Sequence, residues 1–198
     1  MDEADRLYIL ATQKLRELGT KNSIQYFEKA AELNHHEALY FMGEYYRTGC
    51  SYQKAFEYFE RAIKFGNLKA MVKLGNMYVN GLLGYKDFDK AKALYEQAYN
   101  EGKYPEAIQS LAEMYVYGYG VPKDITKALL ICSEAYKETQ SLTPIDVILE
   151  IVKYNSDEFA ISYLALFAKI KELEAQVAYQ PDGSGYLEAK QHFESLQS

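Results

Sequence analysis

One sequence segment occurs three times in this chain, and this repetition constrains the fold more than any other feature. The copies cover residues 38–67, 70–102 and 107–138, and a fainter fourth copy is visible at 26–34. A repeat of this length is typical of solenoid proteins, in which each unit buries its apolar face only against its neighbours. The three copies share these anchors: Ala38, Ala70 and Ala107; Tyr46, Tyr78 and Tyr115; Gly49, Gly81 and Gly118; Ala55, Ala91 and Ala128; Ala62, Ala98 and Ala135.

Each copy contains two apolar patterns with helical spacing, separated by a corner that contains glycine. The pattern predicts a helical hairpin per copy, and hairpins stacked into an all-α, right-handed α-solenoid. Gly43 and Gly75 fall in the middle of predicted helices, where glycine costs about 1 kcal/mol relative to alanine. We therefore expect these two glycines, with Ala112 in the third copy, to allow two helices to approach closely.

The corner of the third copy, Gly118-Tyr119-Gly120, superficially resembles a phosphate-binding loop. A dinucleotide-binding loop requires a preceding strand and a third glycine, whereas this corner follows a helical pattern. We expect Gly118 to end one helix in the left-handed conformation, and Asp124 to cap the next helix with its carboxylate.

These residues resemble the Sel1-like repeat family, a branch of the tetratricopeptide-like helical solenoids. The resemblance covers about residues 22–138, although the 38–67 copy lacks the family's glycine-valine-aspartate corner. It implies that the chain is an adaptor or scaffold that assembles other proteins. The family pattern is matched most fully by Ala70, Leu74, Gly75, Met77, Tyr78, Gly81, Asp87, Lys90, Ala91, Tyr95, Ala98 and Gly102.

The C-terminal part carries none of the repeat pattern. We predict a solenoid over residues 1–141, a helical cap over 142–180 with helices at about 144–154 and 156–179, and a turn with a terminal helix over 181–198. The second cap helix has an apolar stripe that would close the open end of the solenoid, or alternatively form a dimer seam. The stripe consists of Leu166, Ile170, Leu173 and Val177.

Charge and composition exclude several classes of protein. Lys and Arg number 22 against 28 Asp and Glu, for a net charge of −6, so the basic footprint of nucleic-acid binders is missing. The first ten residues are acidic where a signal peptide would be basic, and no apolar run is long enough to span a bilayer. We therefore expect a soluble, cytoplasmic protein, with no nucleic-acid or membrane partner.

Catalytic and metal-binding patterns are weak. His35, His36 and Glu37 form a polar trio, but adjacent helical residues point in different directions, so we interpret the trio as a solvated turn rather than a metal site. Cys50 and Cys132 lie about two repeats apart, too far for a disulfide. No catalytic triad or P-loop is present, and we expect neither an enzyme nor a cofactor.

The first helix of each hairpin lines the concave groove in tetratricopeptide-like solenoids, so the resemblance allows the groove residues to be identified from the repeat anchors. Their mixture of tyrosines, amides and carboxylates suits a basic or neutral peptide or helix. Asp5, Thr12, Glu37, Lys69, Val72, Val79 and Glu106 belong to the same surface. The predicted partner-binding residues are Tyr8, Tyr40, Glu44, Arg47, Asn76, Gln109, Glu113 and Tyr117.

The sequence thus favours a non-catalytic adaptor or scaffold that binds a segment of another protein in its groove. Two alternatives stay open. An inhibitory or immunity-type protein would mask one folded partner, which the acidic charge also permits. A structural homo-oligomer would assemble through residues 156–179.

Overall fold

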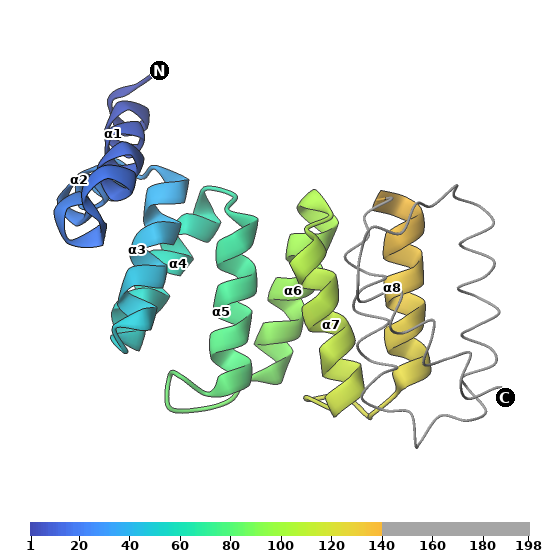
Figure 1. Ribbon diagram of the computed structural model, residues 1–198. Coiled ribbons are helices and arrows are strands. Elements are labelled where there is room, and N and C mark those ends of the chain that lie inside the picture. Colours follow the sequence, from blue (N-terminus) through green and yellow to red (C-terminus); the bar gives the residue numbers. More distant parts are fainter. Residues whose placement is uncertain (140–198) are drawn as a thin grey trace, which may run out of the picture. The chain divides into compact units, whose positions relative to one another are not determined.

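The computed structural model describes residues 1–139, which fold into α-helices (Figure 1). The predicted cap helices, the terminal helix, the apolar stripe and the boundary at 141 lie outside the described residues. Among residues 1–139, no helix combines the length and apolarity that crossing a membrane requires. The described helices are α1 (Glu3–Leu18), α2 (Thr20–Glu32), α3 (His36–Thr48), α4 (Tyr52–Lys64), α5 (Leu68–Asn80), α6 (Phe88–Gly102), α7 (Pro105–Tyr117) and α8 (Ile125–Thr139).

The chain divides into two units between Ala107 and Ile108, within α7. In the first unit, α1 packs on α2, α3 on α4 and α5 on α6, and successive hairpins stack through α2–α3 and α4–α5. This arrangement confirms the prediction of an all-α solenoid built from helical hairpins. It also shows that the faint copy is a complete hairpin, since Ala11 of α1 and Phe27 of α2 are fully buried.

Gly43 and Gly75, in the middle of their helices, mark close helix contacts, as predicted. A Cβ on Gly43 would overlap the ring of Phe59, and a Cβ on Gly75 would overlap the ring of Tyr95. Both rings are almost completely buried. Each glycine therefore makes room for an aromatic side chain from the second helix of its own hairpin.

The corners also form as expected. Gly81 and Gly118 end their helices with φ of 68° and 71°, and the carboxylates of Asp87 and Asp124 accept hydrogen bonds from the third backbone N–H that follows, at 3.0 and 2.9 Å. The left-handed glycine and the carboxylate cap satisfy backbone groups that a helix end leaves without partners. This geometry confirms that the Gly118–Gly120 stretch is a helix corner.

The sequence pattern assigns the anchor tyrosines Tyr46, Tyr78 and Tyr115 to the core, and the structure confirms this prediction only in part. Tyr78 and Tyr115 are buried, but the equivalent Tyr46 is half-exposed. The ring of Tyr78 is covered in part by Tyr85, which belongs to the long corner between α5 and α6. The corner after Tyr46 is much shorter, so this ring is covered instead by the stacked ring of Tyr58 and by the ammonium of Lys54.

Candidate protein-interaction surface

Five of the predicted partner-binding residues lie on the first helices of the hairpins in the first unit. Tyr8 belongs to α1, Tyr40, Glu44 and Arg47 belong to α3, and Asn76 belongs to α5. All five are half-exposed. The repeat explains the placement, since Tyr8 and Tyr40 occupy equivalent positions, as do Glu44 and Asn76.

Tyr40 is the central residue of this surface. Its ring packs against buried Phe59 with centroids 6.1 Å apart, and the Nζ atom of Lys69 lies 5.8 Å from the ring centroid. Burial is the main cause that raises the pKa of Tyr40 to about 12, followed by the negative charges of Glu44 and Glu37. Glu106 acts in the same direction, whereas Arg47 opposes it. The Tyr40 phenol therefore stays protonated and remains a hydrogen-bond donor among carboxylates.

Tyr104 is a second tyrosine in this environment, and the sequence pattern did not predict it. Burial and the neighbouring Glu106 raise the pKa of Tyr104 to about 12, with smaller contributions from Tyr40 and Glu37. Tyr104 precedes Ala107 by three residues, as His35 and Asn67 precede their own repeat alanines. That equivalence was the signal in the sequence that could have identified it. We call the following set the acid–tyrosine surface: Tyr8, Glu37, Tyr40, Glu44, Arg47, Lys69, Tyr104 and Glu106.

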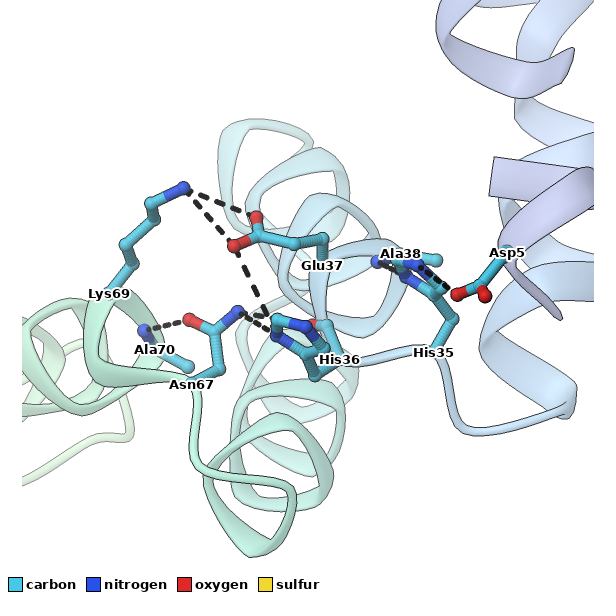
Figure 2. Close-up of polar contacts among 8 residues, drawn as sticks. All are labelled: Asp5, His35, His36, Glu37, Ala38, Asn67, Lys69 and Ala70. Atoms are coloured by element: carbon cyan, nitrogen blue, oxygen red, sulfur yellow. Dashed lines mark hydrogen bonds and ion pairs between the residues drawn. The ribbon is translucent and has the colours of Figure 1, made fainter. Parts of the chain in front are cut away.

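His35 and Asn67 cap helices and make polar contacts with the preceding hairpin (Figure 2). The Nδ1 atom of His35 accepts the Ala38 N–H at 3.2 Å and so caps α3, and its Nε2 atom lies 3.7 Å from Asp5 of α1. Asn67 caps α5 through Ala70 at 3.0 Å, while its amide donates to the His36 carbonyl at 3.2 Å.

The sequence interpretation of this trio as a solvated turn is wrong for His35. Its side chain is only 11% exposed, and its ring stacks on Tyr8 with centroids 4.3 Å apart. Burial lowers the pKa of His35, and nearby His36 lowers it further, while Asp5 and Glu37 oppose the shift. The ring is needed as a neutral acceptor, because protonation at Nδ1 would remove the cap of α3.

Lys69 links two neighbouring first helices. From α5, its ammonium contacts both carboxylate oxygens of Glu37 on α3 at 3.2 Å (Figure 2). Glu37 is 26% exposed and Lys69 is 45% exposed. The pair therefore lies at the surface, where water and a partner can reach it.

Glu44, Arg47 and Asn76 are held in fixed orientations. The guanidinium of Arg47 donates two hydrogen bonds to the Glu44 carboxylate, at 2.8 and 2.9 Å. The hydroxyl of buried Tyr95 donates to the Asn76 side-chain oxygen at 2.6 Å. Val72, which the repeat assigns to the same face, is only 3% exposed and packs in the core. These contacts reduce the entropy that ordering the polar groups would cost on binding.

The remaining predicted residues belong to the second unit. Gln109 donates to Glu113 at 3.0 Å along α7. Tyr117, at the end of α7, is 59% exposed, and its ring lies 5.5 Å from that of Tyr119. Together they place polar and aromatic side chains on the accessible surface of α7.

The described residues were compared with the requirements of a metal site and of a reactive thiol. Within residues 1–139, no group of three His, Cys, Asp or Glu side chains is placed to hold a metal ion. Burial raises the pKa of Cys132 to about 12, so this thiol is not a nucleophilic thiolate at neutral pH. Cys50 is exposed and forms no disulfide.

Comparison with protein families identifies the repeat. The Sel1 repeat model matches residues 20–35, 36–67, 68–103 and 105–138, more than half of the chain. The chain belongs to the Sel1 repeat family. The match to the first hairpin begins at α2, which agrees with the weaker repeat pattern before residue 26. Sel1 repeats are typically protein–protein interaction modules, and these scaffolds are generally non-catalytic.

Solved structures of Sel1 repeat proteins share this fold. A Sel1 repeat protein from Oxalobacter formigenes is 20% identical, with a TM-score of 0.61 over 75% of this chain and 63% of that one. The protective antigen c5321 of uropathogenic Escherichia coli, which displays an SLR fold, is 24% identical, with a TM-score of 0.63 over 87% of this chain and 37% of that one. The chain thus spans less than two thirds of either structure. A search of curated proteins found no match.

Proposed function

We propose that the chain is a non-catalytic adaptor or scaffold that binds a segment of another protein on its acid–tyrosine surface. The observation that supports this most is the environment of Tyr40. A half-exposed tyrosine lies among the carboxylates of Glu37, Glu44 and Glu106, which come from two different helices. An amphipathic ring with fixed polar neighbours is the type of residue that contributes most to the affinity of protein interfaces.

The surface favours a segment of basic or neutral character. It carries three carboxylates against two cations, and one of these cations, Arg47, is already engaged by Glu44 through two hydrogen bonds. The chain as a whole has a net charge of −6, which accelerates association with a basic partner and disfavours an acidic one. Gln109, Glu113 and Tyr117 of the second unit are further candidate contact residues, on α7.

Affinity capture with matched variants tests this proposal. The wild-type chain, Tyr40→Ala and Glu44→Lys are immobilised and exposed to an extract of the native source, and the retained proteins are quantified by mass spectrometry. Glu60→Lys is the control, because Glu60 is an exposed carboxylate on the second helix of the same hairpin. We expect a protein that the wild type and Glu60→Lys retain equally, and that both surface variants lose.

The folded state of each variant is checked by helical circular dichroism and thermal unfolding, because Tyr40 also packs on Phe59. A protein retained equally by all four chains would place binding elsewhere on the molecule. Retention of no protein by any chain would favour self-assembly, which the molar mass in solution would reveal.

A further inference from the structure

One position of the repeat carries a charged residue in four successive repeats, and three of these four residues belong to the acid–tyrosine surface. Asp5, Glu37, Lys69 and Glu106 occupy the same position of four successive repeats, each one residue before the repeat alanine or its equivalent. Three are carboxylates and one is an ammonium. Lys69 is thus the only cation in an otherwise acidic row, and its ammonium contacts the carboxylate of the preceding repeat.

The position of the Lys69 ammonium corresponds to that of a bound cation. The ammonium donates to both carboxylate oxygens of Glu37 at 3.2 Å and lies 5.8 Å from the centroid of the Tyr40 ring. A carboxylate and an aromatic face together are the groups that proteins use to bind lysine and arginine side chains. Tyr8 lies in the same charged environment: burial raises the pKa of its hydroxyl, the charge of Glu37 raises it further, and the charge of Lys69 opposes the shift.

The Lys69–Glu37 pair is also easy to exchange. Lys69 is 45% exposed and is attached through a flexible side chain, and an ion pair between such side chains contributes little to stability. Arg47 differs, because two parallel hydrogen bonds hold it on Glu44. If Lys69 turns towards solvent, the Glu37 carboxylate and the Tyr40 ring lose the ammonium that contacts them, while Arg47 keeps its two hydrogen bonds to Glu44.

We propose that the Lys69 ammonium occupies the position at which a lysine or arginine side chain of the partner binds. On binding, the partner's cation displaces Lys69 from Glu37 and Tyr40. This inference rests on the proposed function and deepens it in two ways. It specifies a partner segment that carries a basic residue. It also assigns Lys69 the role of an internal competitor that weakens binding and disfavours segments without a cation.

Binding of selected peptides to matched variants tests the inference. A phage-displayed library of random 12-residue peptides is selected on the full-length chain, and the enriched peptides are synthesised with a fluorescent label. Their affinities for the wild type, Lys69→Met, Lys69→Arg, Glu37→Gln, Tyr40→Ala and Glu44→Lys are measured by fluorescence polarisation. Lys64→Met is the control, because it removes the same charge from the end of the second helix α4.

We expect peptides enriched in Lys or Arg. Lys69→Met should bind them about threefold to fivefold more tightly, because the internal competitor is gone. Glu37→Gln should bind about tenfold more weakly, because the carboxylate that accepts the cation is gone. Lys69→Arg and Lys64→Met should bind like the wild type, and neutralising the peptide's basic residue should abolish the difference between Lys69→Met and the wild type.

Three results would overturn the inference. Enrichment of acidic peptides, or weaker binding by Lys69→Met, would show that Lys69 itself recognises a carboxylate of the partner. Peptides that depend on Tyr40 but not on Glu37 or Lys69 would refute the displacement while leaving the proposed function intact. Failure to select any peptide that Tyr40→Ala or Glu44→Lys weakens would contradict the proposed function as well.

Discussion

Gly75 offers the sharpest test of how the helices are packed beneath the binding surface. Gly75 lies in the middle of α5, and a Cβ there would overlap the ring of Tyr95 from α6. The Tyr95 side chain is only 2% exposed and its hydroxyl donates to Asn76 at 2.6 Å. Moving this buried ring away from a new methyl group would therefore strain or break the hydrogen bond to Asn76.

Opposing effects decide the outcome of Gly75→Ala. Alanine in place of glycine favours the helix by about 1 kcal/mol. Overpacking a filled core costs about 1–3 kcal/mol, and loss of the Tyr95–Asn76 hydrogen bond costs about 1 kcal/mol more. We therefore expect the free energy of unfolding to decrease by about 1–3 kcal/mol, although glycine is the poorer helix former.

Urea unfolding followed by helical circular dichroism measures this difference. Gly49→Ala serves as the matched control, because Gly49 has a φ of −81° and its added Cβ would come no closer than 3.4 Å to a backbone oxygen of Tyr45. We expect this control to change the stability by less than about 0.5 kcal/mol.

A stabilising effect of Gly75→Ala would refute the reasoning, since helix propensity would then outweigh packing. A double-variant cycle adds a second criterion. Tyr95→Leu removes the ring that the methyl group meets, so Gly75→Ala should cost much less in that background, with a coupling of at least about 1 kcal/mol. Additive effects would show that the cost does not arise from this contact.

Two further predictions concern the contacts between hairpins. Because burial lowers the pKa of His35 below its ordinary value of 6.5, the folded state favours the neutral imidazole. The contribution of His35 to the free energy of unfolding is therefore complete above about pH 6.5 and is lost as the pH falls towards the folded-state pKa. His35→Asn keeps a capping side chain without titrating, so urea midpoints between pH 8 and pH 5 should decrease less for this variant than for the wild type, and equal decreases would contradict the role of His35. Arg61→Ala removes the hydrogen bonds from α4 to the Ala31 carbonyl and the Asn34 side chain, at 2.8 and 2.9 Å, and should cost about 1–2 kcal/mol in thermal or urea unfolding. No change would show that water replaces these contacts.

The repeat pattern by itself determined most of the described fold. Hairpin boundaries, the left-handed glycines of the corners and the Asp87 and Asp124 caps depend on residues close together in the sequence, so spacing and residue type suffice to predict them. The contacts of Gly43 and Gly75 could be predicted because glycine weakens a helix interior, and close packing against a neighbouring helix compensates for that cost. The site residues on α1, α3 and α5 could be placed because the period assigns each one to a position of its helix.

The tertiary structure alone decided which side chains meet across repeats. Lys69 contacts Glu37 from 32 residues away, and Tyr104 joins the environment of Tyr40 although a loop carries it. His35 is a largely buried cap rather than a solvated turn residue because the ring of Tyr8, from the preceding hairpin, stacks on its ring. Such contacts depend on side-chain conformations and on corner lengths, which vary between repeats while the anchor residues stay the same. The period therefore predicts where a residue lies on its helix, whereas its partner and its exposure follow from the packing of neighbouring hairpins.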